Sequence, residues 1–304
     1  MTVSITRLFE QGPVLRTLAG VAAASLTAKP RASAPPALPG PWLEMTLPPR
    51  SPELLRDFIR FSGGDPSWYR GRVPAHLFPQ WGFPLAARAM SSLSYPMQRV
   101  MNAGCRLEQR APLPANEPLL IRARLERLDD DGRRALITTR IETGTRSAPG
   151  AVIAHMNAFV PLGRGSAPDQ PRPGPRPKKE LPTVPVAARE LAFVRFGAKA
   201  GWEFAKLTGD LNPIHWIPPA ARASGFRSVI LHGFATLSRA LEALNRGVFA
   251  GDVSALASVE VRFTKPLVLP RAVGVYATAA SELFVGDAPG GAAYLQGTFE
   301  RQSS

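Results

Sequence analysis

Apolar residues recur at helical spacing in several segments of the chain and alternate with polar residues in most of the others. Residues 51–61 begin with Ser-Pro and place Leu54, Leu55, Phe58 and Phe61 on one face, which predicts a capped amphipathic helix. Further helices are predicted from Pro84 to about residue 93 and over 198–207, 218–224 and 234–245. Strands are predicted over 103–110, 118–128, 134–143, 151–161, 191–196, 255–265, 271–282 and 292–300.

The order of these elements repeats along the chain. Residues 82–93 share Gly, Phe, Arg, Ala and Leu at the same spacing with residues 233–244, at an offset of 151 residues. Pro112-Leu113 and Pro266-Leu267 each fall between two predicted strands, at an offset of 154 residues. Two matches in the same order favour a duplication of one unit, a helix followed by an antiparallel sheet. The predicted fold class is therefore α+β.

Composition divides the chain into four parts. Residues 1–50 predict a loose N-terminal arm. Its apolar residues 14–26 predict a short helix, because Glu10 and Arg16 interrupt the pattern of a signal peptide. Residues 27–50 are rich in Pro, Ala and other small residues and predict an extended, poorly structured segment. Residues 51–162 hold the first unit and 184–304 the second. Residues 163–183, rich in Pro and Arg, predict a linker between them.

The net charge of +14 admits two interpretations: polyanionic partners, or a proteome that favours Arg and Ala. The charges are scattered, and no nucleic-acid-binding motif accompanies them, so we expect no nucleic-acid partner. One cysteine, Cys105, excludes an intramolecular disulfide, indicates a reducing, cytoplasmic setting, and is predicted to be a buried packing thiol. No segment is long and apolar enough for a membrane span.

Polar side chains gather in the stretch Thr208-Gly-Asp-Leu-Asn-Pro-Ile-His215. Gly209 and Pro213 favour a turn, so the Asp210 carboxylate and the His215 imidazole can converge on one water and share its proton. Asn212 can orient either group through its amide. The alternative is that Asp210 and Asn212 only cap the following short helix, while His215 fills a polar niche.

The sequence His232-Gly233 precedes a long predicted helix. Helix N-termini bind anionic oxygens, so the Gly233 N–H is a candidate oxyanion donor. The counterpart of the reactive turn in the first unit, residues 61–68, has the Gly-Asp but neither the Asn nor the His, which predicts one active site per chain. No metal site is predicted, because His76, His155 and His232 lack metal-ligand spacing.

The turn and the following Leu-His-Gly-Phe resemble the signature of MaoC-like dehydratases, the (R)-specific enoyl-CoA hydratase group. The resemblance implies a hot-dog fold, in which an antiparallel sheet wraps a long helix, and the duplication matches the double hot-dog form with one degenerate half. It implies reversible hydration of trans-2-enoyl thioesters to (R)-3-hydroxyacyl thioesters, with no cofactor. Asp210 and His215 would activate the water and handle the C2 proton, in roles left open; Asn212 would support them and the Gly233 N–H would bond the thioester oxygen.

The substrate implied is an acyl-CoA or an acyl-carrier-protein thioester, both of which carry phosphate. Candidate phosphate-binding residues flank the motif: Arg195, Lys199, Arg222 and Arg227. Candidates for the wall of an acyl-tail tunnel are Trp81 and Phe83, with Phe78 and Leu85, although core packing explains each equally well. His232 is assigned no chemistry beyond orienting the turn.

Two other functions stay open from sequence, a hot-dog thioesterase and a non-catalytic acyl-thioester-binding protein. The turn disfavours the first and the intact second unit disfavours the second. Because a double hot-dog chain contains both halves of one pseudo-dimer, we expect a monomer or a homodimer.

Overall fold

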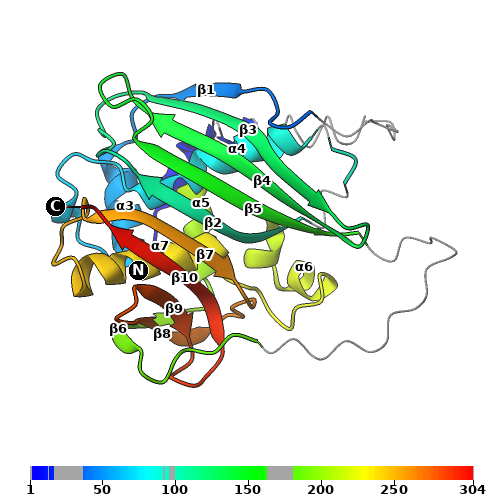
Figure 1. Cartoon of the computed structure of the whole chain (residues 1–304), viewed down its shortest axis with the longest axis vertical. Coiled ribbons are helices and arrows are strands. Elements are labelled where there is room, and N and C mark those ends of the chain that lie inside the picture. The colour runs from blue at the N-terminus through cyan, green and yellow to red at the C-terminus, as the bar shows by residue number, and fades with distance from the viewer. Residues whose placement is uncertain are drawn as a thin grey trace, which may run out of the picture.

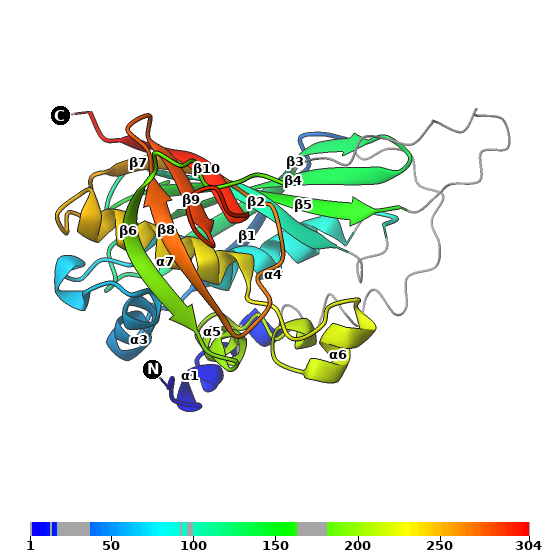
Figure 2. The same cartoon turned by 90° about the horizontal axis from the view of Figure 1, so that it is seen from below.

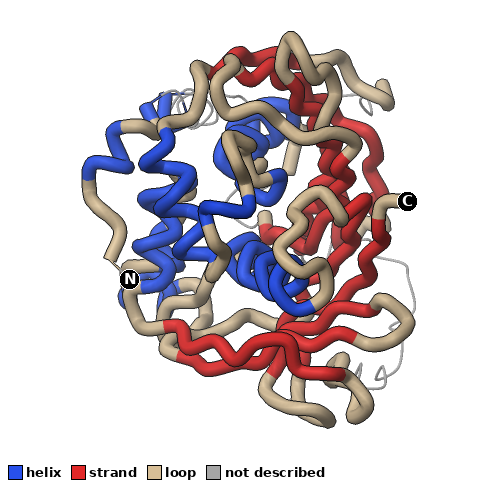
Figure 3. Tube along the Cα trace, turned by 90° about the vertical axis from the view of Figure 1, so that its left-hand side faces the viewer, coloured by secondary structure: helices blue, strands red, loops and turns tan. Residues whose placement is uncertain are grey.

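The structure of the protein is a computed structural model and describes residues 2–12, 14–16, 37–91, 93–95, 100–162 and 181–303. Within these ranges ten strands form one antiparallel sheet in the order β1-β3-β4-β5-β2-β7-β10-β9-β8-β6. The helices lie on one side of this sheet, which curves around them (Figures 1 and 3). The arrangement buries the apolar face of each strand against helices and leaves the other face to solvent.

Each half of the chain contributes five strands. The first half supplies β1 (Leu43–Leu47), β2 (Met101–Gln109), β3 (Leu119–Asp130), β4 (Arg134–Gly144) and β5 (Val152–Pro161). The second half supplies β6 (Arg189–Phe196), β7 (Leu256–Phe263), β8 (Arg271–Ala277), β9 (Glu282–Gly286) and β10 (Ala293–Arg301). Each half has its first strand at an edge of the sheet, and its third, fourth, fifth and second strands follow in that order toward the centre. The two halves thus repeat one topology.

The halves join where β2 pairs with β7. Cys105 lies opposite Val261 in this ladder, and Gly104 lies opposite Arg262. A Cβ on Gly104 would come within 2.0 Å of the Val261 carbonyl oxygen, and the residue has a φ of 141°, so only glycine fits there. Burial raises the pKa of the Cys105 thiol. The predicted packing thiol is therefore part of the seam between the halves.

Two helices lie at the centre, α4 (Pro79–Met90) and α7 (Gly233–Gly247). The ring of Phe234 packs edge-on against Phe78, Phe83 and Phe263, with centroids 5.2, 5.4 and 5.6 Å away. Such aromatic pairs contribute about 0.5–1.5 kcal/mol each beyond the area they bury. The start of α7 is therefore held by side chains from both halves.

The remaining helices cover α4 and α7 or connect the strands. They are α1 (Thr6–Phe9), α3 (Pro52–Ser62), α5 (Ala200–Thr208) and α6 (Pro218–Ala223), with 3-10 turns η1 (Pro66–Trp68), η2 (Ala75–Leu77) and η4 (Pro213–His215). The predicted cap of α3 is confirmed, because the Ser51 hydroxyl accepts a hydrogen bond from the Leu54 N–H at 3.1 Å. No helix among the described residues has the length and apolarity that crossing a membrane requires.

Two predicted elements have the wrong bounds. The helix α4 begins at Pro79 rather than after Pro84, which lies inside it. The alignment of Gly82 with Gly233 is therefore displaced by about one helical turn, because the helix that begins at Gly233 corresponds to one that begins at Pro79. Residues 271–282, predicted as one strand, contain all of β8 and only the start of β9, with Ser281 at a φ of 59° in the turn between them.

The N-terminal arm is not loose where the structure describes it. Residues 43–47 form β1 and pair with β3, so the first unit begins before residue 51. Val3 and Val14 are buried as deeply as core residues. The predicted helix over 14–26 lies mostly outside the described residues, as does the predicted linker except for 181–183, where Thr183 bridges Ala292.

Candidate active site

The reactive stretch folds as a turn between α5 and η4. The helix α5 ends at Gly209, whose φ of 76° reverses the chain. The Asp210 carboxylate accepts from the Asn212 N–H at 3.3 Å, and the Asn212 side chain accepts from the Ile214 N–H at 3.3 Å. Asn212 is therefore the cap of η4, and the capping alternative is correct for this residue. This turn, with α6 after it, lies on the helix side of the sheet (Figure 2).

His215 is placed at the end of η4 with one nitrogen engaged. Its Nδ1 lies 2.8 Å from the Ile230 carbonyl oxygen, which has only lone pairs to offer, so Nδ1 carries the proton and Nε2 keeps a free lone pair. The backbone of His215 packs directly against α5, because a Cβ on Gly201 would come within 2.0 Å of the His215 carbonyl oxygen. Glycine on α5 is thus a requirement for this position of the histidine.

His232 stacks on His215, with ring centroids 3.6 Å apart and an interplanar angle of 24°. Its Nε2 lies 3.2 Å from the Asp210 carbonyl oxygen and 3.7 Å from Asp210 Oδ2. His232 therefore ties the turn to the start of α7, which is the orienting role expected from sequence.

Burial dominates the titration of both imidazoles. Loss of hydration lowers the pKa of His215, and the Asp210 carboxylate only partly opposes that shift. Burial, reinforced by His215, holds the pKa of His232 well below its ordinary value. Both rings are therefore neutral near pH 7, and His215 presents an unprotonated Nε2.

A cavity of about 710 Å³ opens beside these groups. Asp210, Asn212, His215 and Gly233 all line it. The first half contributes the opposite wall from α4, the start of β2 and the end of β5: Phe83, Ala87, Met90, Val100, Met101, Asn102, Ala103, Met156, Asn157, Ala158 and Phe159. The cavity therefore has a polar end built by the second half and a largely apolar wall built by the first.

Gly233 is the first residue of α7, where the leading N–H groups have no partner inside the helix. A Cβ at this position would come within 2.7 Å of the Phe263 ring, so glycine lets the helix start lie against β7. An acceptor in the cavity can therefore approach the positive end of the helix dipole.

Residues 174–282 match the family model described as a MaoC like domain. The matched residues lie in the second half of the chain and include the catalytic turn and α7. Its sequence is 27% identical to 3-hydroxyacyl-thioester dehydratase X of Mycobacterium tuberculosis over 212 residues, 68% of this chain and 70% of that protein. It is 29% identical to the peroxisomal enoyl-CoA hydratase 2 of Arabidopsis thaliana over half of this chain and 51% of that protein.

The crystal structure of HtdX from Mycobacterium tuberculosis matches with a TM-score of 0.66 at 20% identity, over 85% of this chain and 99% of that one. A second Mycobacterium tuberculosis protein, which has a double hot-dog fold, matches with a TM-score of 0.50 at 16% identity, over 89% of this chain and 99% of that one. The predicted resemblance to MaoC-like proteins and the predicted α+β double hot-dog fold are confirmed.

The predicted acyl-tail residues separate into two groups. Phe83 lines the cavity. Trp81 does not, because it is fully buried and its Nε1 donates to the Thr143 hydroxyl at 2.8 Å. Phe78 and Leu85 are likewise core residues. Core packing is thus the correct interpretation for all of these except Phe83.

The four predicted phosphate ligands do not line the cavity. Arg195 lies over the Phe193 ring, and Lys199 and Arg222 are exposed at the ends of α5 and α6. Arg227 comes closest, because its charge acts on the lining residue Tyr294. The sequence analysis missed Lys265, which lines the cavity with its Nζ 5.7 Å from the Tyr294 ring centroid. The feature of the sequence that could have identified Lys265 is its position directly before the repeated Pro266-Leu267 pair.

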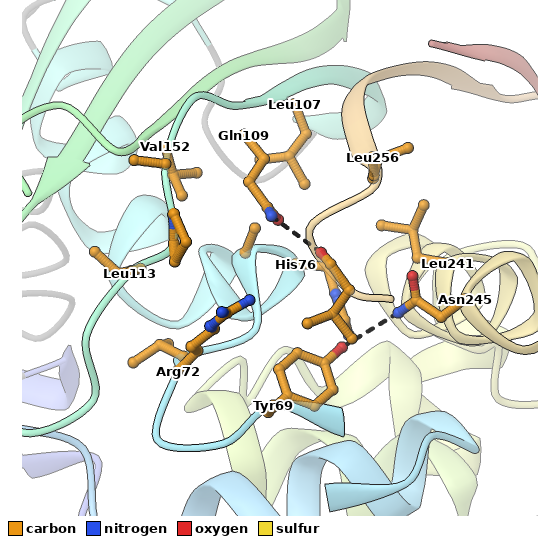
Figure 4. Close-up of a pocket in the computed structure, with 15 residues that line it drawn as sticks. Tyr69, Arg72, His76, Leu107, Gln109, Leu113, Val152, Leu241, Asn245 and Leu256 are labelled. Carbon is orange, nitrogen blue, oxygen red and sulfur yellow. Dashed lines mark hydrogen bonds between the residues drawn. The ribbon is translucent and has the colours of Figure 1, made fainter. Parts of the chain in front are cut away.

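The first half holds a filled counterpart of this site. Asp65 caps η1 just as Asn212 caps η4, with Ser67 N–H 2.9 Å from its carboxylate, so Trp68 takes the place of His215. The side chains of Tyr69, Arg72 and His76, drawn in Figure 4, line a space whose volume is only about 20 Å³. Such a volume holds about one water. Among the described residues, the reactive set therefore occurs once.

Three side chains at the site could in principle ligate a metal ion, since the ligand atoms of Asp210, His215 and His232 lie within 4.8 Å of one another. One nitrogen of each histidine is directed at a backbone carbonyl oxygen. The His232 Nδ1 is buried without a hydrogen-bond partner among the described residues, so the expectation that no metal binds here stays a prediction.

Lowered imidazole pKa values predict a definite pH dependence. Hydration activity should stay level as pH falls to 6.5, the ordinary histidine pKa, and decline only below it, when His215 protonates. The free energy of unfolding should change in the same direction. As pH falls, His215 binds its proton in the unfolded chain before it does so in the folded chain, so the stability present above pH 6.5 is lost as pH falls toward the folded-state pKa. Rate profiles and thermal melts from pH 4.5 to 8 measure both effects, and an activity that halves near pH 7 would contradict the assignment.

Proposed function

We propose that this protein is a hydro-lyase that adds water reversibly across the C2=C3 bond of trans-2-enoyl thioesters, giving (R)-3-hydroxyacyl thioesters. The observation that carries the proposal is the meeting of Asp210, His215 and the Gly233 N–H at the polar end of one cavity. The names of the relatives support the same reaction class.

In the proposed reaction one water lies between Asp210 and His215. His215 Nε2 accepts a proton from the water, Asp210 accepts a hydrogen bond from its other proton, and the oxygen attacks C3. The Gly233 N–H donates to the thioester oxygen as enolate charge develops there. The protonated His215 then returns its proton to C2, so the enzyme ends unchanged and one H and one OH have been added. We propose no metal and no redox cofactor for these steps.

We propose that the thioester carries CoA or a phosphopantetheine arm, with its phosphates near Lys265 and Arg227. Among the described residues, Lys265 and Arg227 form no ion pair with a carboxylate, whereas the neighbouring Arg271 is paired with Asp287 at 2.5 Å. An unpaired cation is the one available for an anionic ligand.

The Lys265→Ala variant should raise the KM for crotonyl-CoA about fivefold and leave kcat unchanged, because an exposed charge pair contributes up to about 1 kcal/mol. With crotonyl-N-acetylcysteamine, which has no phosphate, the same variant should match the wild type. Arg222→Ala, an exposed cation outside the cavity, is the matched control. An equal effect on both substrates would show that Lys265 does not bind phosphate.

The proposal is tested by hydration of enoyl-CoAs of increasing chain length, with chiral analysis of the product and a thiol reagent to detect released CoA. Formation of the (R)-3-hydroxyacyl-CoA is expected. Free CoA without hydration would instead identify a thioesterase, and binding without either product would identify a non-catalytic acyl-binding protein.

A further inference from the structure

The N-terminal segment, residues 2–12 and 14–16, packs against the catalytic turn although it is nearly 200 residues away in sequence. Val3, Gln11 and Val14 are 2%, 0% and 1% exposed. The helix α1 lies beside α5 (Figure 2). Three side chains of this segment are therefore as buried as core residues, whereas others such as Phe9 are exposed.

Polar contacts hold the segment to both halves of the chain. On the side of the second half, the Val3 N–H donates to Glu203 at 2.5 Å, and the buried Lys206 ammonium donates to the Val3 carbonyl oxygen. On the side of the first half, Arg7 pairs with Asp57 at 2.7 Å. Buried charges require such partners, so the Glu203–Lys206 pair on α5 depends on Val3 to complete its hydrogen bonds.

Gln11 binds the end of α5. Its Nε2 lies 3.2 Å from the Leu207 carbonyl oxygen and 3.3 Å from that of Lys206, two acceptors left without partners where a helix ends. Its Oε1 accepts from Gln80 on α4 at 2.8 Å. The Gln80 Nε2 also lies 3.3 Å from the Leu207 carbonyl oxygen. The turn to Asp210 begins directly after Leu207 and Thr208, so the two hydrogen-bonded amides of Gln11 and Gln80 together hold the position from which the turn begins.

Val14 completes the wall of the cavity next to the turn. It is one of the residues that line the 710 Å³ space. A Cβ on Gly209 would come within 2.9 Å of Val14 Cγ1 and 3.4 Å of Gln11 Cβ. The side chain of Val14 thus lies against the residue that precedes Asp210.

We propose that the N-terminal segment is a working part of the active site, with Gln11 as a positioning residue for the catalytic turn and Val14 as a residue that contacts the bound acyl thioester. The inference rests on the proposed function for the chemistry that the turn performs. It assigns to Gln11 a role in kcat and to Val14 a role in substrate selection.

The test for Gln11 is the Gln11→Met variant, which keeps the volume of the side chain and loses its hydrogen bonds. We expect kcat for crotonyl-CoA hydration to fall by about tenfold to 100-fold with little change in KM, because a displacement of about 1 Å can cost 100-fold in rate. Phe9→Ala, on the same segment and 80% exposed, should leave both constants unchanged. Thermal unfolding, monitored in parallel, identifies any variant that is simply unfolded at the assay temperature.

The test for Val14 is the Val14→Trp variant, which replaces a small aliphatic side chain of the cavity wall by a bulky indole ring. Calorimetric binding of octanoyl-CoA, a saturated ligand that requires no turnover, should weaken by about tenfold or more, with Phe9→Ala again as control. A shift in the ratio of kcat/KM between octenoyl-CoA and crotonyl-CoA is expected as well.

The outcomes separate the two proposals. If the wild type hydrates enoyl-CoAs and both Gln11→Met and Val14→Trp behave like Phe9→Ala, the inference about the segment is overturned and the proposed function stands. If the wild type hydrates no enoyl-CoA, the proposed function fails, and octanoyl-CoA binding by Val14→Trp still decides whether the segment contacts ligand.

Discussion

The His215→Ala variant should hydrate crotonyl-CoA at least about 1000-fold more slowly than the wild type, a loss of about 4 kcal/mol of transition-state stabilisation. The imidazole lines the cavity, and its Nε2 stays unprotonated because Nδ1 carries the proton and donates a hydrogen bond to the Ile230 carbonyl oxygen; Nε2 has no hydrogen-bond partner in the part of the chain that the structure describes. Removing it leaves the water without a proton acceptor. Asp210→Asn should cause a loss of similar size, since the amide keeps the hydrogen bond from Asn212 N–H but removes the charge.

The matched control for this pair is His155→Ala. His155 is a half-buried imidazole on β5 that does not line the cavity. The His155→Ala variant should retain wild-type kcat and KM. Circular dichroism should show that all three variants are folded. Full turnover by both His215→Ala and Asp210→Asn would overturn the proposed mechanism.

Gly201→Ala should inactivate the enzyme without touching a catalytic side chain. The new Cβ would lie 2.0 Å from the His215 carbonyl oxygen, so α5 or η4 must move by about 1 Å to reach ordinary contact. We expect kcat to fall about 100-fold and the free energy of unfolding to fall by about 1–3 kcal/mol. A displaced His215 would also lose its hydrogen bond to Ile230.

Gly197→Ala is the control for this variant. Gly197 lies just before α5, whereas Gly201 lies in its first turn, and a Cβ on Gly197 would meet no atom within 4 Å. Activity and the denaturant midpoint should match the wild type. If Gly201→Ala were as active and as stable as Gly197→Ala, the position of His215 would not depend on close packing against α5.

Local features of the fold and the site follow from sequence because their causes are local. Ser51 caps α3 through a group three residues away, and the strands β2 to β5 alternate apolar and polar residues over their own length. Asp210, Asn212 and His215 converge because Gly209 and Pro213 shape one short turn. Within such short distances along the chain, residue types alone restrict the backbone enough to predict the geometry.

The start of α4 and the boundary between β8 and β9 were not predicted correctly from the sequence. Pro79 and Pro84 both suit a first helical turn, and the helix begins at Pro79 and continues through Pro84, where it buries Trp81 and Leu85 in the core. The assignment of Asp65 to the position of Asp210 also failed, because Gly-Asp pairs look alike in sequence, whereas the cap of η1 places Asp65 where Asn212 lies.

The sequence by itself determined the repeated unit, the chemistry of the turn and the glycine at the start of α7. Only the tertiary structure decided which distant residues complete the site: Phe83 and Lys265 on the cavity wall, Trp81 in the core, and Gln11 and Val14 beside the turn. The physical reason is that a side chain's role in a cavity depends on which elements the sheet and helices bring to it. Periodicity along the chain reports which face of an element is buried, but not what lies opposite.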